Sequence, residues 1–316
     1  MIFRQLHDAG VLGINRRNGS YTLKWNKRRF YPLVDDKLQT KRLCREAGLP
    51  VPKLLAVAHH HFQLAHLLDQ VADRDDFVLK PVHGAMGNGI VVVVGRDGDA
   101  LVRASGKRMN ASEFRYHAAG IISGLYALGG QPDQAMVEER LIVHPLFRDI
   151  ATNGVPDVRV VVFRGVPVMA MTRLPTADSG GRANLHQGAI GAGIDLVTGR
   201  TTYAVRHNRP CSRNPDSNRD VLGVEIPHFE TILEIAVRAT DRTNLGYVGA
   251  DLVLDEQRGP VILELNARPG LAIQIANRAG LMPRLDAIER TWQAGRSVEE
   301  RVALGRDVAR SNPPLA

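Results

Sequence analysis

Two apolar segments late in the chain carry polar side chains at fixed positions, and they constrain the fold more than any other feature. Residues 247–254 and 261–265 are rich in β-branched and aliphatic residues and are separated by a short turn at residues 255–259. This pattern predicts two consecutive strands that can pair. Asp251 lies on the first strand. Glu264 and Asn266 are two residues apart at the end of the second, so both side chains point to one face.

Asp251, Glu264 and Asn266 are therefore candidate ligands for Mg²⁺. Carboxylate and amide oxygens are the donors that Mg²⁺ prefers where it bridges nucleotide phosphates. Polar groups that interrupt an apolar strand cost stability unless they are paired or bound to a metal. The alternative is an ordinary strand hairpin with polar residues near one end.

A lysine followed by a glycine-rich segment is a candidate phosphate site. Lys80 ends a predicted strand at residues 77–80, and Gly84, Gly87, Asn88 and Gly89 follow it. Glycines let backbone N–H groups approach phosphate oxygens closely, and a lysine adds a positive charge. The order of residues matches neither the P-loop nor the dinucleotide fingerprint. The alternative is a turn before the next predicted strand at residues 90–94.

A third predicted strand, residues 135–141, carries Glu138 and Glu139. Its main-chain groups could pair with an adenine base. The alternative is an ordinary strand with a surface Glu–Arg pair.

Four further polar residues could surround a transferring phosphate. Arg159 and Arg173 lie on a predicted hairpin that turns at Gly165, and Arg182 and Asn184 lie in the loop after it. Arginines near a phosphate would stabilise charge on the transferred group. Taken alone, they are more often surface charges.

The remaining chain predicts helices and loops around these strands. The N-terminal segment has a polar patch at residues 15–19 and an alternation of Tyr21, Leu23 and Trp25 that could form a strand. Asp35 and Asp36 are expected to cap the next helix. Helices are predicted at about residues 37–47, 62–72, 112–128 and 228–245 and after residue 270, and a surface helix is predicted after about residue 290.

Composition excludes several classes of protein. The 44% hydrophobic content excludes global disorder, and we expect no signal peptide and no membrane-spanning segment. The two cysteines are too few for a disulfide framework, so a cytoplasmic location is expected. Basic residues give a net charge of +8, but aromatic residues make up only 5%, which argues against a base-stacking surface. An anionic small-molecule ligand or a solvated basic face explains the charge better than nucleic acid.

In chain order these residues resemble the ATP-grasp superfamily, and most closely the RimK-type α-L-glutamate ligases. The resemblance covers roughly residues 35–290. The residues that carry it are Lys37, Lys80 with its glycine loop, Glu138, Asp157-x-Arg159, Arg173, Arg182-x-Asn184, Asp251 and Glu264-x-Asn266.

The resemblance implies an α+β fold in which two α+β subdomains clasp ATP. Lys37 and Lys80 would contact phosphates, and residues 83–89 would close as a lid. Glu138, Glu139 and Leu141 would hold adenine, partly through the backbone. Asp251, Glu264 and Asn266 would hold two Mg²⁺ ions, for which Mn²⁺ could substitute. Residues facing the γ-phosphate and the acyl phosphate would be Arg159, Arg173, Arg182 and Asn184.

The implied activity is an ADP-forming carboxylate–amine ligase, plausibly an α-L-glutamate ligase. It would activate a carboxylate as an acyl phosphate, which a small-molecule or peptide amine then attacks. An ATP-grasp enzyme of sugar or polymer modification and a nucleotide-binding scaffold without ligase activity are the alternatives. The expected partners are these substrates. Whether a second copy of the chain is also a partner is left open by the sequence.

Two departures from the family pattern concern the substrates. These ligases carry a full α/β domain before the ATP-binding part, where this sequence has a truncated N-terminal segment of about 36 residues. The carboxylate that grips the ribose has no clear match, and His144 occupies its place. The expected organisation is an N-terminal segment at 1–36, an ATP-grasp domain at 37–290 with its lid at about 75–140, and a C-terminal tail at 291–316.

Overall fold

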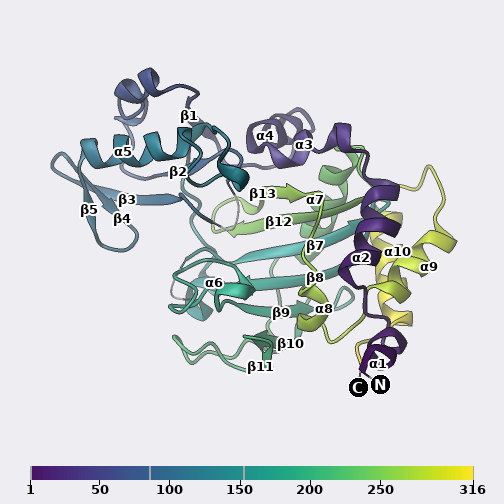
Figure 1. Cartoon of the computed structure of the whole chain (residues 1–316). Helices are drawn as coiled ribbons and strands as arrows, with labels where there is room; N and C mark the ends of the chain where they lie inside the picture. The colour runs from purple at the N-terminus through teal and green to yellow at the C-terminus, as the bar shows by residue number, and fades with distance from the viewer. Residues whose placement is uncertain (1, 85–86, 152–153, 316) are drawn as a thin grey trace. The chain divides into compact units, whose positions relative to one another are not determined.

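The computed structural model describes residues 2–84, 87–151 and 154–315. It has an α+β fold made of two compact units, each with its own antiparallel sheet (Figure 1). Unit 1 comprises Met1–Asp35, Gln39–Val51 and Val143–Ala316, and unit 2 comprises Asp36–Leu38 and Pro52–Ile142. The expected α+β class with two antiparallel sheets is confirmed.

Unit 1 is built on a seven-stranded sheet with the order β11-β10-β9-β8-β7-β12-β13. Every neighbouring pair is antiparallel. The predicted hairpin across Gly165 and the two late strands are both present. The strands are β7 (Asp157–Phe163), β8 (Val166–Leu174), β9 (Ile190–Ile194), β10 (Thr201–Arg206), β11 (Arg209–Pro210), β12 (Tyr247–Asp255) and β13 (Gly259–Asn266).

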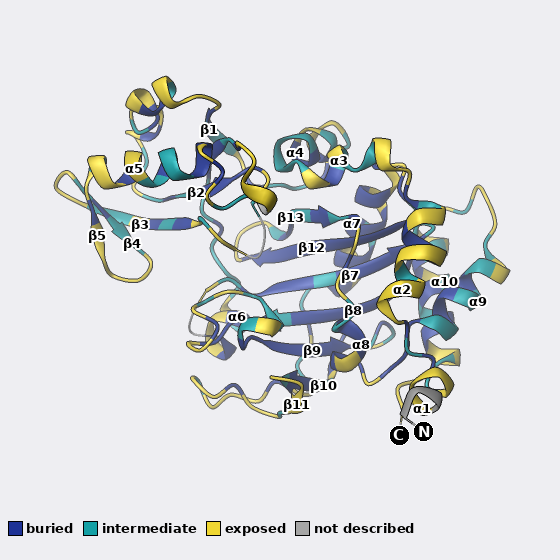
Figure 2. Ribbon diagram, viewed as in Figure 1, coloured by how far each residue is buried: buried dark blue, intermediate teal, exposed yellow. Residues whose placement is uncertain are grey.

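The two faces of this sheet have separate cores, as the alternation of side chains requires. Val158, Val160 and Val162 of β7 belong to one apolar cluster, whereas Val161 and Phe163 belong to the other. The strands are buried almost throughout, and the exposed residues lie on loops and on the outer faces of helices (Figure 2). Buried polar side chains on these strands, such as Asp157, Thr172 and Asp251, are therefore exceptions in an otherwise apolar sheet.

Helices of unit 1 cover both faces of the sheet. The cluster with Val160 includes α7, and the cluster with Phe163 includes α8 and α9. Helix α10 also packs on β8, where Gly305 leaves no room for a side chain because a Cβ there would lie 2.4 Å from the Pro167 carbonyl oxygen. The helices are α1 (Ile2–Asp8), α2 (Ile14–Arg16), η1 (Arg17–Leu23), η2 (Arg28–Phe30), α3 (Pro32–Asp35), α6 (Pro145–Ile150), η6 (Leu185–Gln187), α7 (Phe229–Asp241), α8 (Ile273–Ala276), α9 (Met282–Thr291) and α10 (Val298–Ser311).

The strand expected from Tyr21, Leu23 and Trp25 is wrong, because residues 17–23 form the π-helix η1 and residues 24–25 continue it as helix. Tyr21 and Trp25 are four residues apart, a spacing that also places them on one side of a helix. Both rings meet Phe163 edge-on, with centroids 5.6 Å apart in each case. Leu23 is 61% exposed, so the expected alternation with three buried residues does not occur.

Unit 2 is built on a six-stranded sheet with the order β1-β6-β2-β3-β4-β5. Phe77 and Phe114 meet edge-on in its core, where α5 packs against β2 and β6. Helix α4 begins in unit 2 and continues into unit 1, and the Asp36 side chain accepts from the Leu38 N–H at its start, as expected of a cap. The elements are α4 (Lys37–Glu46), β1 (Leu54–Ala58), η3 (His61–His66), η4 (Asp69–Val71), β2 (Phe77–Pro81), β3 (Val91–Asp97), β4 (Ala100–Arg103), β5 (Arg108–Met109), α5 (Ala111–Ile122), η5 (Leu128–Gly130) and β6 (Ala135–Glu138).

Two helix predictions in unit 2 were wrong in detail. The helix expected at residues 62–72 is two separate 3₁₀ turns, η3 and η4. Leu64, Leu67 and Val71 still point into the core, so short turns satisfy the same apolar spacing. Helix α5 ends at Ile122 instead of residue 128, because Gly124 takes a left-handed conformation with φ +81°.

None of the helices within the described residues is long and apolar enough to cross a membrane.

Candidate functional site

Acidic and basic side chains gather at one end of the unit 1 sheet, on the face that carries Phe163. The strand register places Asp251 opposite Arg159 and also opposite Glu264, and it places Asp157 opposite Arg173. Residues opposite one another in paired strands share a face. β-Sheet pairing therefore brings together side chains that are far apart in the sequence.

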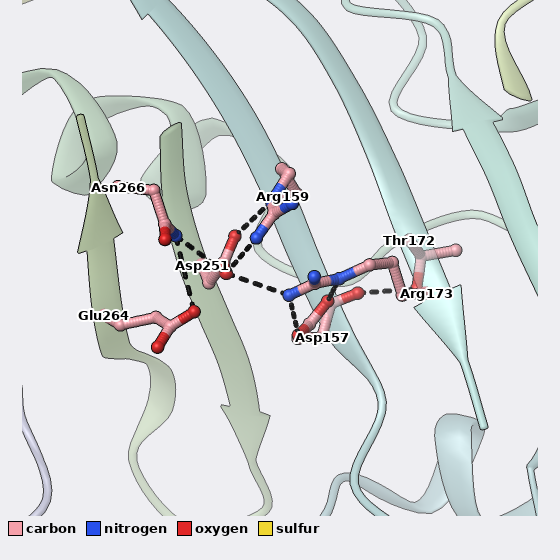
Figure 3. Close-up of polar contacts among 7 residues, drawn as sticks. All are labelled: Asp157, Arg159, Thr172, Arg173, Asp251, Glu264 and Asn266. Atoms are coloured by element: carbon pink, nitrogen blue, oxygen red, sulfur yellow. Dashed lines mark hydrogen bonds and ion pairs between the residues drawn. The ribbon is translucent and has the colours of Figure 1, made fainter. Parts of the chain in front are cut away.

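Asp251 is the centre of this group. Arg159 donates to it through two bonds, from Nε to Oδ1 at 2.6 Å and from Nη2 to Oδ2 at 2.5 Å. Arg173 donates to the same Oδ2 at 2.9 Å and holds Asp157 with a second pair of bonds (Figure 3). The Asp157 backbone carbonyl also accepts from the Thr172 hydroxyl at 2.9 Å. Two arginines and two aspartates thus neutralise one another.

Burial sets the protonation of this group. Burial alone would raise the pKa of Asp251, but the positive charges of Arg159 and Arg173 outweigh it and hold that pKa well below its usual range. Burial and the nearby Asp251 charge raise the pKa of Asp157 to about 6, although Arg173 opposes this. Asp251 is therefore the carboxylate that stays ionised.

Glu264 and Asn266 lie beside Asp251 and complete the predicted metal-ligand set. The Asn266 side-chain nitrogen donates to Asp251 Oδ2 at 3.2 Å and to Glu264 Oε1 at 3.4 Å. Glu264 and Asn266 are half-buried, whereas Asp251 is 1% exposed. The structure thus brings the three predicted side chains together.

This donor set fits Mg²⁺ chemically. The oxygen and nitrogen of an Asn amide are assigned from their hydrogen bonds, so a flipped Asn266 would point its oxygen at both carboxylates. Asp251 Oδ1 accepts a single hydrogen bond and keeps a lone pair for a cation. Among the described residues no three His, Cys, Asp or Glu side chains form a metal cluster, and here the third donor is an amide.

Arg182 and Asn184 lie in the loop that precedes β9. The Arg182 side chain is exposed, and its backbone N–H donates to the Ser179 carbonyl at 3.2 Å. Asn184 Oδ1 accepts from the His186 N–H at 3.0 Å and so begins the short helix η6. Neither side chain contacts the Asp251 group within the described part of the chain.

In unit 2, Lys80 and Glu138 form a buried ion pair. Their side chains are 8% and 4% exposed. They lie on the adjacent strands β2 and β6, where Glu138 is opposite Val78. Lys37 donates from Nζ to the backbone carbonyls of Val82 and Gly84, at 3.1 and 2.7 Å. Both predicted lysines of unit 2 are therefore held in place, Lys37 against the start of the glycine-rich segment.

The glycine-rich segment needs its glycines. Gly87 and Gly89 have φ angles of +75° and +76°, which other residues rarely adopt. A Cβ on Gly84 would lie 2.1 Å from the Pro81 ring, and one on Gly89 would lie 2.6 Å from the Tyr126 ring. Asn88 is exposed between Gly87 and Gly89. Ala85 and Met86, which belong to the predicted lid, lie outside the described residues.

The residues expected near adenine and ribose occupy the chain after β6. Glu139 exchanges hydrogen bonds with Lys53, through its backbone N–H and through its carboxylate. Leu141 is buried. His144 caps helix α6, because its Nδ1 accepts from the Leu146 N–H at 3.2 Å. The cap therefore uses Nδ1, one of the two ring nitrogens of His144.

Comparison with known proteins decides the family. A family model described as sugar-transfer associated ATP-grasp matches residues 16–290. The chain belongs to the sugar-transfer associated ATP-grasp family. This assignment confirms the resemblance to the ATP-grasp superfamily. The match begins at residue 16, within the N-terminal segment.

Curated relatives of this ATP-grasp protein are named as glutamate ligases. A probable α-L-glutamate ligase of Citrobacter koseri is 24% identical over 253 residues, which is 80% of this chain and 61% of the relative. A ribosomal protein bS6–L-glutamate ligase of Escherichia fergusonii shows the same identity and coverage. The chain therefore spans about three fifths of the length of these relatives.

Solved structures of ATP-grasp ligases are also similar to this ATP-grasp chain. One of them, the ATP-grasp ligase PsnB in complex with a minimal precursor, is 16% identical with a TM-score of 0.45. That comparison covers 89% of this chain and 63% of the other.

Three residues near the site were missed in the sequence or given no role. Asp157 was noticed only as part of a motif, although it binds Arg173. Asp178 and His207 form a pair with 2.6 Å between Oδ2 and Nε2, and they are 29 positions apart in the sequence. The signal available in the sequence for the turn that carries His207 was Asn208, because asparagine tolerates a positive φ.

Proposed function

We propose that this ATP-grasp protein is an ADP-forming carboxylate–amine ligase that activates a carboxylate as an acyl phosphate. The observation that carries the proposal is the grouping of Asp251, Glu264 and Asn266 on paired strands. It lies next to two arginines that could receive a phosphate. The family membership and the relatives named as glutamate ligases support a ligase that adds glutamate.

Unit 1 supplies the groups for phosphoryl transfer. Asp251, Glu264 and Asn266 would hold two Mg²⁺ ions, and these ions neutralise the charge that develops on the nucleotide phosphates. Arg159 and Arg173 are oriented by their aspartate partners, so little rearrangement is needed to present N–H groups to the transferred phosphate. Arg182 and Asn184 would add contacts from the loop before β9.

Unit 2 supplies the groups for the nucleotide. Lys80, held by Glu138, and Lys37, held by two backbone carbonyls, would donate to phosphate oxygens. Gly84, Gly87, Asn88 and Gly89 would let backbone N–H groups approach the phosphates. Glu138, Glu139 and Leu141 would hold adenine through the backbone after β6, and His144 would serve the ribose.

The family description favours a second candidate for the substrate. Its association with sugar transfer is consistent with a carboxylate or amine carried by a sugar or a polymer. The chemistry at Asp251 would be the same, and only the acceptor would differ. A nucleotide-binding scaffold without ligase activity would have no need for the three oxygen donors together.

A screen of substrates tests the proposal. Pairs of amino acids, and amino acids with amino sugars, are incubated with the protein, ATP and Mg²⁺. Phosphate release is measured, and each product is identified by mass spectrometry. We expect at least one pair to give ADP, phosphate and an amide.

The variant Glu264→Ala isolates the metal ligands. It should abolish turnover of ATP while the circular dichroism spectrum and the melting temperature stay close to those of the wild type. Glu256→Ala is the matched control, because Glu256 lies in the turn that joins the same two strands and pairs with Arg148 on the surface. Wild-type turnover in Glu264→Ala would refute the metal assignment.

A further inference from the structure

A small pocket in unit 1 lies outside the phosphate-transfer groups. It has a volume of about 200 Å³ and is lined by Leu185, His186, Val205, His207, Asn208 and Ala272. Pockets for drug-sized ligands are typically about 300–1,000 Å³. This pocket therefore suits a single small group, such as an amino acid or the end of a longer chain.

The strand register relates this pocket to Arg173. Val205 of β10 lies opposite Gly191 of β9, and Gly191 lies opposite Arg173 of β8. The three residues form one row across the sheet and share a face. Adjacent strands are about 4.8 Å apart, so two strand spacings separate the backbone at Val205 from that at Arg173.

Leu185 continues this face from Arg173 to the pocket. A Cβ on Gly191 would lie 2.5 Å from a Leu185 methyl group, so Leu185 fills the place where a side chain of β9 would stand. Leu185 also lines the pocket. The pocket thus lies on the sheet face that carries Arg173. Gly191 and the Leu185 side chain that covers it lie between Arg173 and the pocket.

His207, which lines the pocket, forms a pair with Asp178. His207 Nε2 lies 2.6 Å from Asp178 Oδ2, and Arg206 Nη2 donates to the same oxygen at 2.9 Å. A carboxylate only accepts hydrogen bonds, so Nε2 carries the proton and Nδ1 keeps the lone pair of the neutral ring. Within the described residues, Nδ1 has no hydrogen-bond partner.

The pair is built against the loop that carries Arg182 and Asn184. A Cβ on Gly188 would lie 2.5 Å from Asp178 Oδ2 and 3.1 Å from His207 Cε1. The Gly188 carbonyl accepts from Arg206 Nε and from the Thr176 hydroxyl. Glycine at this position therefore permits close contact between the loop and the pair.

We infer that this pocket binds the amine substrate and that His207, oriented by Asp178, accepts a proton from its ammonium group. The inference rests on the proposed ligase function and names the class of one substrate, a small primary amine. An aspartate that orients a histidine base is a recurring device for proton transfer.

His207 Nδ1 takes one proton from the ammonium, which leaves a neutral amine with a free electron pair. The amine nitrogen attacks the acyl carbon, a C–N bond forms, and the C–O bond to phosphate breaks. The electron pair of that bond leaves with the phosphate, and the second proton lost from the nitrogen goes to phosphate or to water.

The charged and titratable groups around His207 are Asp178, Arg206 and His186. Asp178 lies on the loop after β8, Arg206 is the last residue of β10, and His186 of η6 lines the same pocket. Hydrogen bonds from His207 and Arg206 lower the pKa of Asp178. Asp178 is thus ionised at neutral pH, as an orienting group must be.

Hydroxylamine separates the two halves of the reaction. It is uncharged and nucleophilic at neutral pH, so it converts an acyl phosphate to a hydroxamate without a protein base. The protein is given ATP, Mg²⁺ and an equal mixture of the twenty protein amino acids, with and without hydroxylamine. Hydroxamate and amide products are quantified by mass spectrometry.

His207→Gln should form hydroxamate at the wild-type rate and lose amide formation by about 10²-fold or more near pH 7. The loss should shrink near pH 9.5, because free amines then deprotonate without a base. Asp178→Asn should change amide formation in the same direction by a smaller factor. The matched control is His66→Gln, because His66 is an exposed histidine that pairs with Asp69 and does not line the pocket.

The possible outcomes separate the two proposals. If the wild type forms neither product, the ligase proposal itself fails, and the pocket assignment fails with it. If the wild type forms both and His207→Gln keeps full amide formation near pH 7, only the pocket assignment fails. An equal loss of hydroxamate and amide in a folded His207→Gln variant would also overturn the role as a base.

Discussion

Arg173 reaches across strand β7 to donate a hydrogen bond to Asp251, at 2.9 Å, while it also holds Asp157. One guanidinium group therefore joins carboxylates on two neighbouring strands, β7 and β12. Burial alone would lower the pKa of Arg173, but the two aspartates outweigh it and raise that pKa above its usual range. The positive charge at this position is permanent.

Arg173→Met should destabilise unit 1 by about 3–5 kcal/mol, because it leaves the buried carboxylates of Asp157 and Asp251 with less positive charge to balance them. The free energy of unfolding is measured by urea denaturation. Arg200→Met is the control, since Arg200 and Glu225 form a surface pair with side chains 54% and 66% exposed, and it should cost at most about 1 kcal/mol. Equal effects of the two substitutions would contradict the central role of Arg173.

Asn26→Ala should destabilise unit 1 by about 2–4 kcal/mol, because three hydrogen bonds to buried backbone groups are lost. The Asn26 side chain donates to the Tyr247 and Ala267 carbonyls and accepts from the Tyr247 N–H. Thermal and urea unfolding provide the measurement. Asn18→Ala, at an exposed position where the side chain bonds its neighbour Arg17, should be nearly neutral. An Asn26→Ala variant as stable as the wild type would show that these contacts of the N-terminal segment add little to the stability of unit 1.

Gly188→Ala should destabilise the protein by roughly 2–3 kcal/mol and displace the Asp178–His207 pair. The new Cβ would meet the Asp178 carboxylate at 2.5 Å, and the φ angle of +101° disfavours any side chain. Gly180→Ala is matched in having a positive φ of +60° but has open space around it, so it should cost only about 1 kcal/mol. Denaturation curves of the two variants would coincide if the close contact were unimportant.

The two cysteines should react with thiol reagents at very different rates. Burial raises the pKa of Cys44 to about 11, so roughly one thiol in a thousand is ionised near pH 8. Burial also raises the pKa of Cys211, which is half-buried in a loop. We expect one fast and one slow alkylation, both faster as pH rises because only the thiolate reacts. Cys211→Ser should remove the fast phase, and its persistence would contradict the burial of Cys44.

The strands that carry the metal-ligand group could be predicted because their signal is local. Val261, Ile262 and Leu263 mark a buried strand, and Glu264 and Asn266 interrupt its apolar pattern at a spacing of two. The pairing of two consecutive strands then places Asp251 opposite Glu264. Such predictions depend only on the residues of one strand, or of two strands that follow each other in the sequence.

Long-range register and helix type could not be predicted in the same way. The contact of Arg173 with Asp251 depends on the order of three strands and on a side chain long enough to cross one of them. Tyr21 and Trp25 fit either a strand or a helix by spacing, and packing against Phe163 decided in favour of the helix. The Asp178–His207 pair depends on the turn at His207 and Asn208, both with positive φ.

The sequence of unit 1 is interrupted by unit 2, and this has a consequence for biosynthesis. A ribosome completes residues 52–142 before it has made a single strand of the seven-stranded sheet. Unit 2 can therefore become native while the chain is still growing. Tyr21 and Asn26 gain their contacts with Phe163 and Tyr247 only after those residues have been synthesised, so the N-terminal segment can dock on unit 1 only late in translation.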